Sequence, residues 1–549
     1  MQFFSRYWHF FSFPFFLLFA FLLYFQSISF GITYSDDNVI FLNHGAFLSD
    51  IDNIPKTFLD DDFQTPGPGT YYRPLVMSSL ILDTQWKSPN SYAAYHLTSI
   101  VLFAITTWLC FLFFCALDFP KLLCFFAAMF FLVHPGNNQS VAWMTGRVDI
   151  LLTIFVLSTL LFFLHFFRTQ KAIWGILSFL FFVLALFTKE TAIVLPVVFV
   201  GMGMLLNTET PSRKGIFSWL AKEKKRDVLP VLFFGVMVTV GTVAWFFLRK
   251  YALASDIPGV EENGIFTREN VFFILHNLPF VLPHLGKIIL PVVLSPYHIA
   301  QDMSFSPGIL SLLFLGIGAW FLRKRIRYSM VLFGLSWFLI FLLPTFLNPD
   351  PEQEKAFFEN RLTLPMIGIL LILLEYSRAF WNQRKQFLII LWSIVLFVFA
   401  FLSFRNIGYY QDGASYWKRA VETSPHSSFA WNNLGAMEYL RGEKEIAKSH
   451  WKRSLHENEN EKLANANLGL LAMESEEYET AEQYFLRELE VDPFSEKGVL
   501  NLAILYANTG RLSEAKALLN SFLKVFSHHT EAQEMLFQIE TFEAQQKKE

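Results

Sequence analysis

The sequence has few cysteines and no excess of charge of either sign. Its three cysteines, Cys110, Cys115 and Cys124, all lie in apolar runs on either side of one short turn. Thiols in such surroundings act as small buried hydrophobic side chains, so neither a disulfide framework nor a zinc site is indicated. The formal net charge is −3 and the isoelectric point is about 6.5, so the charge balance does not point to a nucleic-acid partner.

Apolar residues are abundant instead. Of the 549 residues, 53% are hydrophobic and 65 are phenylalanine, and several apolar runs are long enough to cross a hydrocarbon core of about 30 Å. A water-soluble domain does not carry that much apolar surface, so the sequence predicts an all-α, polytopic membrane protein. The first run, residues 10–30, is too long for a typical signal-peptide core, and no small-residue cleavage site precedes Tyr34. We therefore expect a retained first helix.

Basic turns predict which helix ends face the cytoplasm, because short loops rich in Lys and Arg stay on that side. Basic residues gather at Arg6, Lys121, Arg168 and Lys171, and in the segments 207–227, 323–327 and 378–385. Counting apolar runs between these places puts them all on one side. The acidic segment 31–92 then forms a long first loop on the opposite, extracytoplasmic side.

One apolar stretch, residues 271–290, does not fit a simple crossing. Pro279, Pro283 and Pro291 interrupt it, and irregular backbone at membrane depth is tolerated only where protein or water covers it. We expect a broken, re-entrant or interfacial element that lines a cavity. The remaining runs make about eleven crossings, so the C-terminal segment is expected on the side of the first loop.

After Phe404 the composition becomes polar and the sequence repeats itself. Leucines recur in register at Leu434, Leu468 and Leu502, a period of 34 residues that resembles tetratricopeptide repeats. We therefore expect a membrane domain over residues 1–405 and a helical solenoid over residues 406–549. Such arrays bind extended peptides or partner helices in a groove. The side chains considered as groove residues here are Asn432 and Tyr439.

Asp36 and Asp37 follow the first apolar run, where a carboxylate stays hydrated and still reaches a lipid head group. Other polar residues fall on the same predicted face: Arg73, His134, Arg147, Asp149, Lys189, Glu190, Glu359 and Arg361. Each alone also fits an interfacial anchor or a helix end. Together they suit a reaction on a lipid phosphate, in which a base takes a proton from an acceptor hydroxyl and cations stabilise the leaving phosphate.

Several short motifs follow in a fixed order along the chain. They are Ser35-Asp36-Asp37, Tyr72-Arg73-Pro74-Leu75, His134-Pro135, Ser140-Val141-Ala142-Trp143 with Gly146-Arg147-Val148-Asp149, and Thr188-Lys189-Glu190. With the repeats behind them, the chain resembles the transmembrane and tetratricopeptide-repeat O-mannosyltransferases, which are GT-C glycosyltransferases, in a bacterial-type form. The resemblance implies transfer of a sugar, mannose in this family, from a polyprenyl-phosphate donor to a hydroxyl on the non-cytoplasmic face.

The resemblance also assigns roles. Asp36 or Asp37 would be the catalytic base, and the cations Arg73, Arg147, Lys189 and Arg361 would face the phosphate. His134 is considered as a contact of the donor phosphate, and Glu359 as a further substrate-binding residue. Asp149 and Glu190 would orient the cations or bind sugar hydroxyls. No cofactor is expected, although paired aspartates can hold a divalent cation through their oxygens. The partners would be the lipid-linked donor, a protein or glycan acceptor and membrane lipids.

The chain departs from the family at two places. Relatives often have Glu where this chain has Gln139, and the sequence Glu359-Asn360-Arg361 lacks the tyrosine of the family motif. Two alternatives therefore stay open: a glycosyltransferase acting on a glycan or glycolipid, and a catalytically inactive membrane-anchored scaffold whose repeats recruit partners. The expected location is a bacterial inner membrane with periplasmic repeats, or the endoplasmic reticulum membrane with luminal repeats in a eukaryote.

Overall fold

The computed structural model describes residues 2–60, 71–86, 91–208, 225–253, 268–347 and 354–546. Within these ranges the chain is helical, and the only β pairing is an isolated bridge between Ile299 and Ala356. The chain divides into two compact units, Met1–Tyr416 and Trp417–Glu549. We call them the membrane unit and the repeat unit. The division lies a few residues beyond the boundary expected at residue 405.

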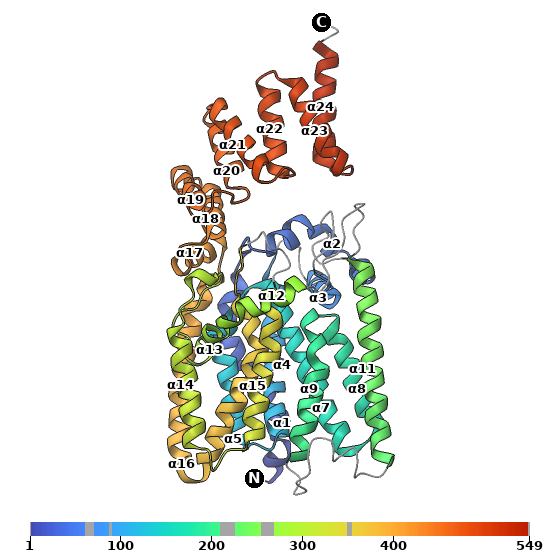
Figure 1. Cartoon of the computed structure of the whole chain (residues 1–549), viewed down its shortest axis with the longest axis vertical. Helices are drawn as coiled ribbons and strands as arrows, with labels where there is room; N and C mark the ends of the chain where they lie inside the picture. The colour runs from blue at the N-terminus through green and yellow to red at the C-terminus, as the bar shows by residue number, and fades with distance from the viewer. Residues whose placement is uncertain are drawn as a thin grey trace. The chain divides into compact units, whose positions relative to one another are not determined.

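The membrane unit is built from apolar helices that run alongside one another (Figure 1). They are α1 (Gln2–Tyr24), α4 (Ala93–Ala116), α5 (Lys121–Val133), α7 (Arg147–Thr169), α8 (Ala172–Leu186), α9 (Leu195–Thr208), α11 (Lys225–Ala252), α14 (Ser306–Phe321), α15 (Tyr328–Leu342) and α16 (Thr363–Asn406). Seven helical segments of the described residues are long and apolar enough to cross a membrane, and other apolar helices are shorter. The chain is therefore an integral membrane protein. Helix length and composition alone do not settle the expected eleven crossings.

The proline-rich stretch is broken, as its sequence predicts. It consists of α12 (Arg268–Asn277), a short 3-10 turn η7 (Leu278–Phe280) and α13 (Val281–Ile289). Pro279 and Pro283 each lie in the first turn of an element, where the missing backbone N–H costs no helix hydrogen bond. In Figure 1, α12 runs across the end of the bundle instead of along it. Whether this element is re-entrant or interfacial stays a prediction.

Basic turns meet at one end of the membrane unit. Glu375 in the middle of α16 is fully buried and accepts hydrogen bonds from the side chains of Arg327 and Arg378. The Arg327 guanidinium also lies 4.8 Å over the ring of Phe119, in the turn after α4. The turns after α4 and α14 and the kink of α16 at Arg384 therefore belong to the same end of the bundle.

Part of the predicted basic side lies outside the description. Residues 209–224, which hold Arg213, Lys214, Lys222 and Lys224, are outside the described residues. The side chains of Lys225, Arg226 and Arg6 are not described either. In the first loop, Asp61, Asp62 and the segment 66–69 also lie outside the described residues.

The first loop folds against the end of the bundle opposite the basic turns. It contains η2 (Val39–Asn43), α2 (Gly45–Ser49), η3 (Ile51–Phe58) and α3 (Pro74–Thr84). Ile40, Leu48, Met77 and Leu80 form a buried cluster with Tyr95 of α4. This small core holds the loop in place, and it fixes the segment that carries Asp36 and Asp37.

The repeat unit consists of successive helix pairs. After α17 (Gly413–Thr423) come α18 (Ser428–Leu440), α19 (Lys444–Glu457), α20 (Ala464–Glu474), α21 (Tyr478–Val491), α22 (Glu496–Asn508), α23 (Leu512–Val525) and α24 (Thr530–Gln546). The turn inside each pair has one residue with positive φ: Gly442, Glu476 and Gly510. These three positions share the 34-residue spacing of the leucines. The repetition in the sequence is thus a repetition of backbone geometry.

Glycine in the first helix of a pair lets the second helix pack closely. A Cβ atom on Gly469 would lie 2.6 Å from the ring of Phe485. Replacing Gly469 by Ala should therefore destabilise the repeat unit by about 1–3 kcal/mol through overpacking. The midpoint of thermal unfolding, followed by circular dichroism of the purified chain, measures the effect. Gly408→Ala is the control, because a Cβ there meets nothing within 4 Å; equal midpoints for the two variants would contradict the packing.

Candidate functional site

The two adjacent aspartates of the first loop have different surroundings. Asp37 is fully buried, and its Oδ2 accepts hydrogen bonds from Thr33 N at 2.7 Å and Thr33 Oγ1 at 2.9 Å. Its Oδ1 accepts a third from Ser35 N at 3.2 Å. Burial raises the pKa of Asp37 to about 6, although these hydrogen bonds oppose the shift. Asp37 thus shapes the turn, and both of its oxygens are occupied.

Asp36 is the accessible carboxylate of the pair. Its side chain is exposed, yet the surrounding protein is close enough to raise its pKa by desolvation. The positive charges of Arg73 and Arg361 oppose that shift. Asp36 therefore combines access for a substrate with two nearby cations.

The hydrogen bonds of Asp37 give a stability prediction. In Asp37→Asn an amide N–H₂ replaces one acceptor oxygen and faces a donor, so we expect a loss of about 1–3 kcal/mol. The folded-state pKa lies above the usual value of 3.8, so the folded state binds the proton more tightly than the unfolded chain does. Ionisation of this group therefore costs stability as the pH rises from about 4 to about 6.

Thermal unfolding midpoints between pH 4 and pH 7 check both parts of this prediction. The wild-type chain should gain stability, relative to Asp37→Asn, as the pH falls through that window. Asp52→Asn, at an exposed position in the same loop, is the control and should follow the wild type. A midpoint for Asp37→Asn equal to that of the control at every pH would contradict the structural role.

Arg73 joins the first loop to the turn after α8. Its guanidinium lies 4.2 Å over the ring of Tyr71, and its Nε lies 3.8 Å from Glu190 Oε2. The backbone N–H of Tyr72 donates to Glu190 Oε1 at 3.2 Å. Arg73 immediately precedes α3, whose Pro74 occupies the first helical position. Glu190 therefore holds the arginine beside the aspartates.

Lys189 and Asp149 form a buried pair behind Arg73. Lys189 Nζ donates to Asp149 Oδ1 at 2.6 Å, and Asn360 Nδ2 donates to Asp149 Oδ2 at 2.7 Å. Burial lowers the pKa of Lys189, the Asp149 carboxylate opposes this, and the charges of Arg73 and Arg361 lower it further. Three cations thus lie within electrostatic reach of one another, and one carboxylate holds the lysine.

Arg361 is the third cation that lies near Asp149 and Arg73. It belongs to the turn η10 (Glu359–Leu362) before α16, and its Nη1 donates to the backbone oxygen of Thr345 at 3.2 Å. The guanidinium lies 5.0 Å over the ring of Phe358. We call the group made by Asp36, Arg73, Asp149, Lys189, Glu190 and Arg361 the charged cluster.

His134 and Arg147 do not belong to this group. His134 Nδ1 accepts from Gly136 N at 3.0 Å, so Nε2 carries the proton that is donated to the backbone oxygen of Ile288. Burial lowers the pKa of His134 to about 4, which keeps it neutral. Arg147 is fully buried and pairs with Asp83 Oδ2 at 2.6 Å. The polar atoms of His134 and Arg147 form hydrogen bonds and an ion pair inside the bundle. Neither residue is assigned to the charged cluster.

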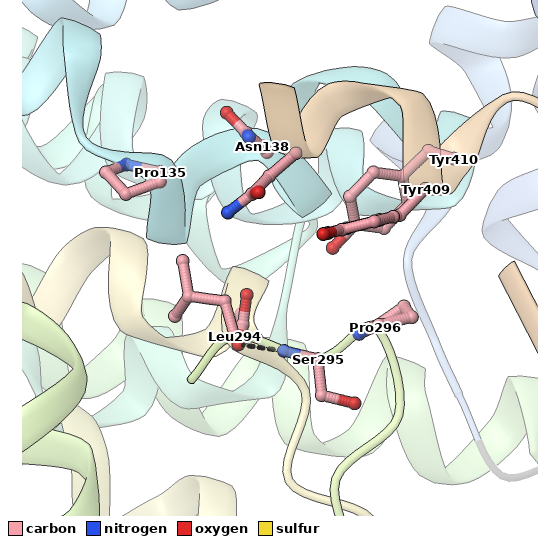
Figure 2. A pocket seen from close by; sticks show the side chains of 9 residues that line it. Pro135, Asn138, Leu294, Ser295, Pro296, Tyr409 and Tyr410 are labelled. Carbon is pink, nitrogen blue, oxygen red and sulfur yellow. Dashed lines mark hydrogen bonds between the residues drawn. The ribbon is translucent and has the colours of Figure 1, made fainter. Parts of the chain in front are cut away.

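Glu359 also lies apart, in a buried ion pair. Its Oε1 accepts from Ser295 N at 2.7 Å and lies 3.5 Å from Lys287 Nζ on α13. It lines a small hollow. Figure 2 shows Asn138 and Tyr410 on the α6 (Asn138–Ala142) and α16 side of this hollow and Ser295 on the other side. Its role as a substrate-binding residue stays a prediction.

Gln139 explains one departure from the family pattern. Its Oε1 accepts from the backbone N–H groups of Glu359 at 2.6 Å and Asn360 at 3.2 Å, and its Nε2 donates to Pro296 O at 2.8 Å. A carboxylate would accept both hydrogen bonds but has no proton for Pro296. The Gln139 amide therefore stabilises the turn η10, which carries Arg361.

Sequence reasoning missed three side chains of this region. Tyr71 and Asn360 stand next to residues that the motifs did select, and only contact geometry distinguishes them. Lys287 had a signal in the sequence, because it is a lone charge inside an apolar, proline-broken stretch. In the part of the chain that is described, no three His, Cys, Asp or Glu side chains gather as a metal site.

Comparison with known proteins gives one relative. The protein O-mannosyl-transferase Tmtc1 of Drosophila melanogaster is 29% identical to the chain over 181 residues. The matched region is 32% of this chain and 20% of the fly protein, so the chain corresponds to about a fifth of that relative's length. No protein-family model matches the chain. The similarity supports a glycosyltransferase-like role.

Proposed function

We propose that this chain transfers a sugar from a polyprenyl-phosphate donor to a Ser or Thr hydroxyl of a protein acceptor, outside the cytoplasm. Mannose is the proposed sugar, because the similar fly protein is named as an O-mannosyl-transferase. The observation that carries the proposal is Asp36: an exposed carboxylate beside Arg73 and Arg361 at the end of an apolar bundle.

Asp36 is the proposed base. A carboxylate that accepts the proton of the attacking hydroxyl must be reachable and must not be held by other donors, and Asp37 fails the second condition. Asp37 instead keeps the turn in shape. Proton abstraction by a positioned base is worth about 10²–10⁴-fold in rate.

Arg73 and Arg361 are the proposed partners of the donor phosphate. Guanidinium groups bind phosphate oxygens through two parallel N–H groups and stay charged, so they stabilise the leaving phosphate as the sugar departs. Lys189 forms an ion pair with Asp149, and this pair lies within electrostatic reach of Arg73 and Arg361. Gln139 and Glu359, where the chain departs from its relatives, act on the turn that carries Arg361 and leave the proposed base unaffected.

The proposed topology has eleven crossings. Support comes from the shorter apolar helices and from the kink at Arg384, which divides α16 into two membrane-length halves. The basic turns would then face the cytoplasm, and the first loop and the repeat unit would face the other side. We propose that the repeat unit belongs to the tetratricopeptide class, because of its 34-residue period, and that the membrane is a bacterial inner membrane or, in a eukaryote, that of the endoplasmic reticulum.

Transfer by the purified chain in lipid nanodiscs tests the proposal. Radiolabelled polyprenyl-phosphate-mannose and a Ser/Thr-rich peptide should give labelled peptide, whereas nucleotide-linked mannose should give none. Label that enters a glycan or glycolipid acceptor in place of the peptide would favour the alternative acceptor. No transfer to any acceptor, with the repeat unit still binding partners, would favour the scaffold.

A further inference from the structure

A surface of exposed cations lies where the turn after α14 meets the kink of α16. The exposed side chains are Arg323, Lys324 and Arg325 on the turn and Arg384 and Lys385 at the kink. Neither the turn nor the residues around the kink, 376–387, contain an acidic residue. Among the described residues no carboxylate pairs with any of these five side chains. We call the five residues the cationic surface.

Hydrogen bonds hold the turn and the kink against each other. Arg325 Nη1 donates to Gln383 Oε1 at 2.7 Å, and Arg378 Nη2 donates to the backbone oxygen of Arg325 at 3.0 Å. The buried Glu375 accepts from the side chains of Arg327 and Arg378 and is therefore engaged with these two arginines. The cationic surface is thus built from two segments of the chain that are fixed to each other.

Tryptophan side chains border the cationic surface. The Arg323 guanidinium lies 5.0 Å over the ring of Trp320, and Lys385 Nζ lies 5.5 Å over the ring of Trp381. Trp320 is 66% exposed and Trp381 is half-buried. Tryptophan gathers at the level of lipid head groups, because its ring is apolar and its N–H is polar. We therefore expect the cationic surface at the depth where lipid phosphates lie.

Apolar faces of α14 and of the second half of α16 lead to the cationic surface. Large apolar side chains spaced three or four residues apart are exposed on both helices: Leu313, Ile317 and Phe321 on α14, and Phe387, Ile390 and Ile394 on α16. Figure 1 shows α14 and α16 at the same edge of the bundle. In an integral membrane protein such faces contact acyl chains, so a lipid that lies along them brings its head group to the cations.

We propose that the cationic surface binds the head group of an anionic phospholipid whose acyl chains lie along α14 and α16. Guanidinium and ammonium groups form charge-assisted hydrogen bonds with phosphate oxygens. Basic residues next to a membrane-spanning helix attract anionic lipids. The bound lipid bridges the turn after α14 and the kink of α16. This inference uses neither the proposed function nor a choice of membrane side.

Native mass spectrometry of the full chain, released from detergent, measures the Kd of the first bound lipid. The probes are phosphatidylglycerol and phosphatidylcholine with the same acyl chains. The wild-type chain should bind phosphatidylglycerol about tenfold more tightly than phosphatidylcholine. The double variant Arg323→Gln, Lys385→Gln should bind phosphatidylglycerol about tenfold more weakly than the wild type and bind phosphatidylcholine equally. Inorganic phosphate at the lipid concentration should not displace phosphatidylglycerol, because the acyl chains contribute to binding.

Another exposed basic turn provides the matched control. Arg168→Gln, Lys171→Gln removes the same two charges, where Arg168 already has Asp118 as a partner, and should leave the affinity for phosphatidylglycerol unchanged. Should thermal unfolding show that the first double variant is destabilised, Lys385→Gln alone decides, and it should weaken binding about threefold. Equal wild-type affinity for the two lipids, unchanged binding by the first double variant, an equal loss in the control, or displacement by inorganic phosphate would overturn the inference.

Discussion

Replacing Asp36 by Asn should lower the rate of sugar transfer by about 10²–10⁴-fold, the usual contribution of a positioned base. The amide keeps the size and polarity of the side chain but cannot take a proton from the acceptor hydroxyl. The described part of the structure has no hydrogen bond to the Asp36 carboxylate, so the fold should not depend on it. The initial rate with labelled donor and peptide measures the loss, and the thermal unfolding midpoint monitors the fold.

Two variants in the same loop separate catalysis from structure. Asp52→Asn changes an exposed carboxylate that does not belong to the charged cluster, and this variant should retain full activity. Asp37→Asn should lose stability first, and its activity per folded molecule should fall less than that of Asp36→Asn. Full transfer by Asp36→Asn would show that another group takes the proton.

Removing both proposed phosphate ligands should produce the second large effect. Each charge-assisted hydrogen bond to phosphate contributes about 1.5–3 kcal/mol. The double variant Arg73→Ala, Arg361→Ala should therefore raise the KM for the lipid-linked donor about a hundredfold or more. Arg168→Ala is the control, since Arg168 lies in the basic turns and pairs with Asp118. An unchanged donor KM in the double variant would contradict the role of these arginines.

The same double variant should change the pH dependence of the rate. Arg73 and Arg361 favour the charged form of Asp36 and hold its pKa below the value that burial alone would produce. Without them the pKa of Asp36 rises. Because the base must be ionised, the acidic limb of kcat against pH should move to higher pH. A limb that stays in place would mean that the titrating group is not Asp36.

Composition and periodicity were sufficient for the larger features of the fold. The prolines of residues 271–290 locate a real break, because proline cannot donate the helix hydrogen bond. The 34-residue period of the leucines is also the spacing of the positive-φ residues Gly442 and Gly510, because a left-handed turn recurs wherever the helix pair does. The break and the period both follow from the sequence alone.

The internal arrangement of the site needed contacts that sequence does not contain. The pattern treats Asp36 and Asp37 alike, yet Thr33 and Ser35 turn one of them inward. Arg147 is part of one of the sequence motifs, but its guanidinium points to Asp83 of α3. The packing of the helices determines that direction. The charge pattern thus groups these residues without distinguishing the side chains that are buried in the bundle from those that are exposed.

In the proposed topology, Asp36 and the repeat unit face the same compartment, opposite the basic turns. Single cysteines at the exposed positions Asp52, Glu445 and Lys324 test this arrangement, with a membrane-impermeant maleimide applied to sealed, oriented vesicles. We expect Asp52→Cys and Glu445→Cys to be labelled from one side and Lys324→Cys only from the other. Labelling of Asp52→Cys and Glu445→Cys from opposite sides would contradict it.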